Sequence, residues 1–176
     1  MSTARRGLIH VYTGDGKGKT SAALGLALRA AGHGWRTYMG QFLKGQEYGE
    51  LETAKLLAGR LTIEQYGKPS FVHAGKATPE DVRLAQEGLA RACRAMLSSE
   101  YRIVVLDEVN VALFFDLVTI EDVLSVIDQK PDDVELVLTG RRVPDEILAR
   151  ADYITVMQEA KHPYQQGIVA RKGIEF

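Results

Sequence analysis

The sequence predicts an α/β fold, in which a mostly parallel sheet carries helices on both faces. Three observations lead to this prediction. Short apolar, β-branched runs alternate with longer helical patterns along the chain. The runs are apolar throughout, as is typical of parallel strands that are buried on both faces. Glycine-rich and charged segments follow the ends of several expected strands, where parallel sheets bind their ligands.

The first half of the chain is expected to supply three strands and two helices. Residues 8–12 are a buried strand, and the alanine- and leucine-rich stretch at 20–31 consists of strong helix formers. This helix should stop at Gly32-His33-Gly34. Two further strands are expected at 36–43 and 61–66, with a short helix at 48–57 between them.

The second half begins with a helix-start signal. Thr78-Pro79-Glu80-Asp81 combines an N-cap residue, proline at the first helical position and acids in the first turn, so a helix should run from there to about Leu97. Thr119-x-x-Asp122 caps another helix, which ends near Lys130-Pro131. The remaining expected elements are strands at 103–106, 134–138 and 153–157 and a short helix at 144–150.

Composition bounds the class of protein. A chain of 176 residues suits one domain, residues 1–176, and 45% hydrophobic with 26% charged residues is ordinary for a globular protein. The net charge of −1 offers no basic field for nucleic acid, and no apolar run approaches the ~20 residues of a membrane span. The single cysteine, Cys93, permits no intrachain disulfide and suits a cytoplasmic setting.

A glycine-rich segment separates the first expected strand from the first expected helix. Its residues are Gly14, Asp15, Gly16, Lys17, Gly18, Lys19, Thr20 and Ser21. Backbone N–H groups of such a loop turn inward toward an anion, and the helix N-terminus adds partial positive charge. Lys19 can reach phosphates, and Thr20 can offer its hydroxyl to magnesium. We interpret the segment as an ATP-binding phosphate loop, hence a RecA-like P-loop NTPase fold, rather than as a glycine turn with an exposed lysine.

The loop departs from the usual pattern. In G-x-x-x-x-G-K-[ST] the first position is glycine, whereas this chain has Thr13 there and its first glycine is Gly14. The phosphates are therefore expected to lie differently from those in ordinary ATPases and GTPases.

Two adjacent acids end the apolar run at 103–106. Asp107 and Glu108 follow a buried strand beside the phosphate loop, where a carboxylate can hold Mg²⁺ directly or through water. Neighbouring side chains at a strand end point in different directions, so the pattern does not distinguish which acid binds the metal. The alternative is a solvated acidic turn.

Six segments occur together, in this order, in one known family: Thr13–Thr20, Gln41–Gly45, Leu106–Glu108, Thr139–Arg141, Lys161–Pro163 and Lys172–Phe176. With them the chain resembles the P-loop type of ATP:corrinoid adenosyltransferase, which works in cobalamin biosynthesis. The resemblance covers nearly the whole chain, and the shifted phosphate loop is itself a trait of the family.

The resemblance implies a reaction. The 5′-deoxyadenosyl group of ATP passes to Co(I) of a reduced corrinoid, and inorganic triphosphate leaves. The family is described as holding ATP reversed relative to most P-loop enzymes, in accord with the unusual loop spacing. The protein then has to position the reactants and neutralise the triphosphate, for which Lys19, Mg²⁺, Lys44 and Arg141 are suited.

The resemblance also implies help with the reduction of cobalt(II), through aromatic side chains that displace its lower axial ligand. The matching segment is 66–73, and Phe71 is the candidate, with His73 as an alternative that could ligate cobalt weakly. An electron-donor protein such as a flavoprotein and a homodimeric state are further implications. The sequence does not distinguish a biosynthetic corrinoid from salvaged cobalamin.

Other classes of function stay open at this point. A RecA-like ATPase would need a water-activating residue and an arginine finger, for which Arg141 is available. A regulatory module would bind ATP without turnover. A small-molecule kinase is disfavoured because no arginine-rich lid segment is found. Asn110 is either a polar site residue or a helix cap, and His162 either fixes its loop or faces the substrate.

Overall fold

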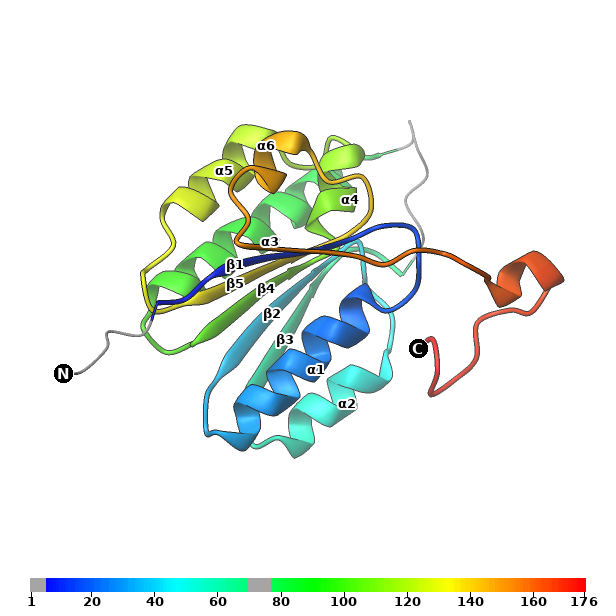
Figure 1. The fold of residues 1–176 in the computed structure, drawn as a ribbon, viewed down its shortest axis with the longest axis horizontal. Coiled ribbons are helices and arrows are strands. Elements are labelled where there is room, and N and C mark those ends of the chain that lie inside the picture. Colours follow the sequence, from blue (N-terminus) through cyan, green and yellow to red (C-terminus); the bar gives the residue numbers. More distant parts are fainter. Residues whose placement is uncertain (1–5, 70–76) are drawn as a thin grey trace.

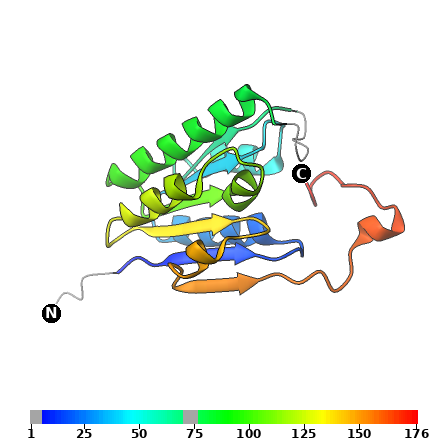
Figure 2. The same ribbon diagram turned by 90° about the horizontal axis from the view of Figure 1, so that it is seen from above.

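The computed structural model describes residues 6–69 and 77–176, which form a six-stranded sheet. The order of the strands is β3-β2-β4-β5-β1-β6, and every neighbouring pair is parallel (Figures 1 and 2). The strands are β1 (Ile9–Thr13), β2 (Thr37–Phe42), β3 (Leu61–Tyr66), β4 (Ile103–Asp107), β5 (Glu135–Thr139) and β6 (Tyr153–Val156). The predicted α/β class is confirmed, and each expected strand exists within one residue at either end.

Helices cover the sheet on both sides: α1 (Lys19–Gly32), α2 (Gly49–Leu56), α3 (Pro79–Leu97), α4 (Val109–Phe114), α5 (Ile120–Asp128) and α6 (Asp145–Leu148), followed by the 3₁₀ turn η1 (Pro163–Gln166). The sequence predicted all of them except α4 and η1. The start of α4 lacks a recognisable signal, because its N-cap is Glu108 in a left-handed conformation with no side-chain cap. Thr78 and Thr119 form the capping boxes expected for α3 and α5.

The central strands contribute side chains to two hydrophobic clusters, one on each face of the sheet. Val104 and Leu106 of β4 pack in the cluster that contains α3, α4, α5 and α6, whereas Ile103 and Val105 pack in the cluster with α1. Successive side chains of a strand point to opposite faces, so a strand between two helical layers is apolar at every position. Figure 1 shows α1 and α2 on one side of the sheet and the other helices on the opposite side.

All strands point the same way, so their carboxyl ends meet at one edge of the sheet (Figure 2). The phosphate loop, Asp107 and Thr139 all follow or end strands at this edge. Beyond β6 the chain continues as an arm, residues 157–176, whose last residues return toward the start of α1 (Figure 1). Among the residues described, no helix combines the length and apolar character needed to cross a membrane.

Candidate functional site

The phosphate loop joins β1 directly to α1. Gly14 and Gly18 have φ angles of 92° and 119°, in the left-handed region that residues with a Cβ rarely adopt. Thr13, which replaces the first glycine of the usual pattern, is instead the last residue of β1 and pairs with Val156 of β6. The loop therefore makes its first turn at Gly14, one residue later, and Thr13 needs no glycine conformation.

The side chain of Lys19 lies across the loop. Lys19 is only 6% exposed, and its ammonium donates to the carbonyl oxygens of Gly14 at 2.7 Å and Gly16 at 2.8 Å. Burial lowers the pKa of Lys19, while the nearby carboxylate of Glu108 acts in the opposite direction. The arrangement places a positive charge among backbone groups at the helix N-terminus, where an anion gains most from it.

Asp107, the last residue of β4, joins the phosphate loop to the end of β5 and to the segment after β2. Its carboxylate is fully buried, and Oδ1 accepts hydrogen bonds from the hydroxyls of Thr20 at 2.9 Å and Thr139 at 2.8 Å. Oδ2 accepts from the ammonium of Lys44 at 2.9 Å. Because a buried carboxylate is stable only when it is paired and hydrogen-bonded, these donors hold Asp107 in one orientation. Asp107 in turn orients the hydroxyl of Thr20.

Glu108 differs from Asp107 in its backbone conformation and in the surroundings of its carboxylate. Its backbone is left-handed, with φ of 64°, and its N–H donates to the hydroxyl of Thr139 at 2.9 Å. Burial and the neighbouring charge of Asp107 raise the pKa of Glu108. Within 6–69 and 77–176, no hydrogen bond or ion pair reaches its carboxylate, and Glu108 lines the cavity described below. Glu108 is thus the acid with oxygens available to a ligand.

Lys44 enters the site just after β2. Its ammonium lies 2.9 Å from Asp107 and 3.8 Å from Glu50, and 5.1 Å from the centre of the Tyr48 ring. Burial by itself lowers the pKa of Lys44, but Asp107 outweighs it, so the pKa is raised and the ammonium stays charged.

Three polar residues around Lys44 were not predicted as site residues, although Gln41 begins one of the segments that carry the family resemblance. Gln41 is fully buried in β2 and donates to Glu50 at 2.9 Å, while Gln65 of β3 donates to the oxygen of Gln41 at 3.1 Å. A glutamine inside an otherwise buried strand is a usable signal, because a buried polar group needs partners. Glu50 had no such signal, since an acid in the first turn of a helix is ordinary.

The phosphate loop, Lys44, Glu50 and Glu108 border a cavity of about 760 Å³. The size is within the usual range for a small-molecule site. Most of the predicted site residues line it: Gly16, Lys17, Gly18, Lys19, Thr20, Ser21, Lys44, Glu108 and Arg141. Its other walls include α1, α2, His162 and the turn at 173–176. Asp107 lies beneath this surface, and Gly14 and Asp15 are outside the lining. Phe71 and His73 lie outside the described residues.

Thr20 and the two acids form the donor set that could hold a metal ion. No group of three or more His, Cys, Asp or Glu with metal-binding geometry occurs in the described part of the chain. Mg²⁺ in nucleotide sites usually takes only one or two carboxylates and completes its shell with phosphates and water. A hydroxyl and a cavity-facing carboxylate therefore fit Mg²⁺ bound together with a nucleotide.

Two residues left open by the sequence have defined positions. Asn110 is fully buried in the first turn of α4, is not its N-cap, and donates to the carbonyl of Gly140 at 3.4 Å. It supports the turn that carries Arg141. His162 caps η1, because its Nδ1 accepts from the N–H of Tyr164 at 3.2 Å, and it also lines the cavity.

A glycine loop at the head of α1, a buried lysine across it and an acid at the end of a neighbouring strand together define a P-loop nucleotide-binding protein. Solved structures share the fold: flagellar accessory protein FlaH from Methanocaldococcus jannaschii (13% identity, TM-score 0.59, 86% of this chain and 71% of that chain) and a KaiC-like protein from Pyrococcus horikoshii OT3 (16% identity, TM-score 0.58, 89% and 74%). Residues 5–176 match the family "ATP:corrinoid adenosyltransferase BtuR/CobO/CobP", and the chain belongs to this family.

Relatives of similar length agree with this assignment. The corrinoid adenosyltransferase of a Sinorhizobium species is 33% identical over 99% of this chain and 82% of its own length. That of Escherichia coli K12 is 33% identical over 97% and 86%, and CobA of Salmonella typhimurium is 34% identical over the same shares. The protein is therefore a transferase enzyme, an adenosyltransferase that acts on corrinoids.

Proposed function

We propose that the protein transfers the 5′-deoxyadenosyl group of ATP to the Co(I) centre of a reduced corrinoid and releases triphosphate, in adenosylcobalamin biosynthesis or salvage. Co(I) attacks the 5′ carbon of ATP, a cobalt–carbon bond forms, and the C5′–O bond breaks with its electron pair on the leaving triphosphate. One observation carries the proposal. In a member of this family, Lys19 donates to the phosphate loop, and both Thr20 and Lys44 donate to Asp107 beside it.

The chain has little covalent chemistry to perform in this reaction, because Co(I) needs no activation. Its task is to orient ATP and stabilise the negative charge of the triphosphate. Lys19 supplies charge within the loop, and Lys44 and Arg141 supply it from the cavity walls. The Lys19 ammonium donates to the carbonyls of Gly14 and Gly16, and it can exchange these hydrogen bonds for hydrogen bonds to phosphate oxygens when ATP binds.

Mg²⁺ would be held by Thr20 and Glu108, with Asp107 as the residue that orients Thr20 and Lys44. Bound there with ATP, the ion would neutralise phosphate charge and favour departure of the triphosphate. Among the described residues the Glu108 carboxylate has no hydrogen-bond partner, whereas both oxygens of Asp107 accept hydrogen bonds from protein donors, which supports this division of roles.

Phe71 is proposed to help remove the lower ligand from cobalt(II), with His73 as the next candidate. The support is the family resemblance of the segment 66–73. Phe71→Ala should lower the rate strongly when a mild, biological-type reductant must reduce bound cobalt(II). It should lower the rate little when a strong chemical reductant supplies Co(I), which has no lower ligand. Equal losses in both assays would assign Phe71 to packing or general corrinoid binding.

The proposed setting follows from the same family. We propose a cytoplasmic homodimer that receives electrons from a donor protein such as a flavoprotein. The single cysteine and near-neutral charge are compatible with that setting.

One assay tests the reaction. Purified protein is incubated with MgATP and chemically reduced cobalamin or cobinamide, and adenosylated product and triphosphate are measured together. Equal amounts of both are expected. ADP and phosphate without adenosylated product would identify a nucleotide hydrolase instead, and ATP binding with neither product would identify a regulatory module.

A further inference from the structure

The phosphate loop is supported from behind by the first residues of the arm that follows β6. The N–H of Gly16 donates to the carbonyl of Met157 at 2.7 Å. A Cβ on Gly14 would come within 2.4 Å of the Met157 carbonyl oxygen, and one on Gly16 within 2.6 Å of the Gln158 carbonyl oxygen. These two glycines are therefore required for the close contact between the loop and the arm.

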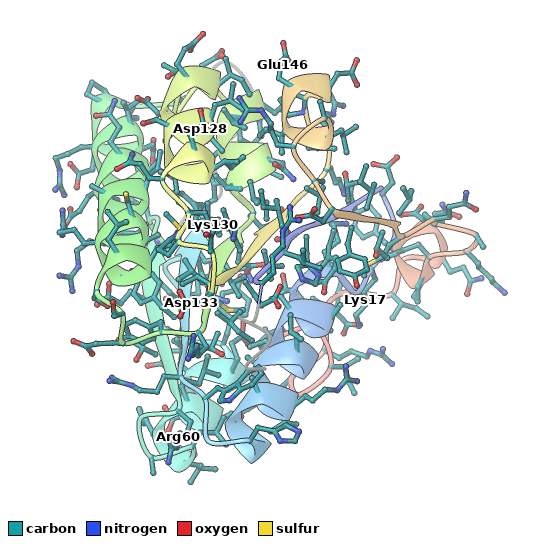
Figure 3. All side chains as sticks on the ribbon, turned by 60° about the vertical axis from the view of Figure 1, so that its left-hand side comes forward. Lys17, Arg60, Asp128, Lys130, Asp133 and Glu146 are labelled. Atoms are coloured by element: carbon teal, nitrogen blue, oxygen red, sulfur yellow. The ribbon has the colours of Figure 1, made fainter. Side chains whose placement is uncertain are left out.

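The last residues of the same arm contact the loop again. The ammonium of Lys17 donates to a carboxylate oxygen of Glu175 at 2.7 Å and to the carbonyl of Ile174 at 3.3 Å. Figure 3 labels Lys17 beside the start of α1. The loop is thus held between two parts of one arm.

The contacting segment has an internal structure of its own. We call residues 171–176 the closing turn. The N–H of Glu175 donates to the carbonyl of Arg171 at 2.9 Å, and the guanidinium of Arg171 donates to the carboxylate of Glu175 at 3.2 Å. The Glu175 carboxylate therefore joins the turn to itself and to Lys17.

The closing turn forms part of the cavity wall. Gly173, Ile174, Glu175 and Phe176 line the cavity together with α1 and α2 residues such as Leu24 and Thr53. The turn borders the cavity without filling it, because about 760 Å³ of space remains with the turn in place. Phe176 is 43% exposed, so part of its ring is available to a ligand.

We propose that the closing turn is a wall of the nucleotide site, and that Glu175 is a positioning residue that holds this wall against the phosphate loop through Lys17. The proposal rests on the proposed function only in taking ATP as the ligand. Exposed ion pairs stabilise little by themselves, so the pair with Lys17 leaves the turn able to open and admit the nucleotide. Contacts with bound ATP would then favour the closed position.

Trypsin reports on the turn directly, because its exposed residues Arg171 and Lys172 are cleavage sites. The full chain is digested with and without MgATP, in the absence of corrinoid, and the loss of the terminal peptide is followed by mass spectrometry. Saturating MgATP should slow this cleavage at least about fivefold, since a protected segment is cleaved only from its open population. Cleavage after Arg150, in the exposed turn before β6, is the internal control and should not change.

A matched pair of variants tests the role of Glu175. Glu175→Gln should weaken ATP binding about three- to tenfold and remove most of the protection, while kcat at saturating ATP stays within about twofold. Glu87→Gln is the control, because Glu87 has a comparable exposed ion pair, with Arg83 at 3.0 Å, on α3 across the sheet. It should behave as the parent in both measurements.

Three results would overturn the proposal. Cleavage of the turn at the same rate when ATP is bound would mean that it is no part of the site. Faster cleavage with ATP, or tighter ATP binding by Glu175→Gln, would mean that the nucleotide displaces the turn. Loss of adenosyl transfer with ATP protection intact would contradict the proposed function alone, so the two failures are distinguishable.

Discussion

The two faces of the sheet serve different purposes. The face under α3, α4 and α5 holds most of the large buried side chains, including Met96, Leu136 and Leu138. The face under α1 is packed largely by small residues of the helix, Ala23, Ala27 and Ala30, which bring α1 close to the sheet. On that face the cavity extends between α1 and α2. The comparison suggests that one face carries stability and the other carries the ligand site.

The largest effect should come from the well-packed face. Leu136 is fully buried in β5, so Leu136→Ala should lower the free energy of unfolding by about 2–5 kcal/mol. Leu28→Ala is the matched change on α1, where the side chain is 58% exposed, and should cost less than about 0.5 kcal/mol. Urea denaturation measures both. Similar losses in the two variants would mean that packing under α3, α4 and α5 contributes no more to stability than an exposed side chain of α1.

The second effect is on activity. Lys19→Ala should remove about 2–4 kcal/mol of transition-state stabilisation, seen as a fall in kcat/KM, together with weaker ATP binding. Lys55→Ala, which removes an exposed lysine of α2, should leave kinetics unchanged. A folded Lys19→Ala enzyme with parental kinetics would refute the phosphate-loop assignment.

The third effect separates the two acids. Glu108→Gln should raise the Mg²⁺ concentration for half-maximal activity about tenfold, comparable to the loss of a group that supports a metal site. Asp107→Asn should mainly lower stability, because Lys44 would lose the carboxylate that compensates its burial. Magnesium titrations of both variants test this. If both titrate as the parent does, neither acid belongs to the metal site.

The smallest effect is a dependence on pH. The pKa of Glu108 is raised in the folded protein, so its ionised form is disfavoured there relative to the unfolded chain. At neutral pH, without metal, Glu108 therefore lowers stability slightly, and this cost disappears as the pH falls through its folded pKa. Glu108→Gln should thus be slightly more stable than the parent at pH 7, with the difference vanishing in acid. Thermal unfolding between pH 4 and pH 7 measures it, and a constant difference would contradict the assignment.

The sequence predicted the elements wherever a local signal existed. The capping boxes at Thr78 and Thr119 define helix starts through contacts three residues apart, so their effect can be read locally. The start of α4 could not be predicted, because Glu108 enters the helix from a left-handed conformation that local propensity disfavours. That conformation is imposed by the surrounding structure, including the hydrogen bond from its N–H to Thr139.

By itself, the sequence determined the α/β class, the phosphate loop and the acids at the end of β4, because strand composition, glycine spacing and strand ends are local properties. The tertiary structure alone decided which distant groups meet. Gln41 and Gln65 join the site because β2 and β3 are neighbours in register. Lys17 meets Glu175 across 158 residues because the arm returns to the loop. Such contacts depend on the order of the strands and the path of the chain, and neither produces a periodic pattern in the sequence.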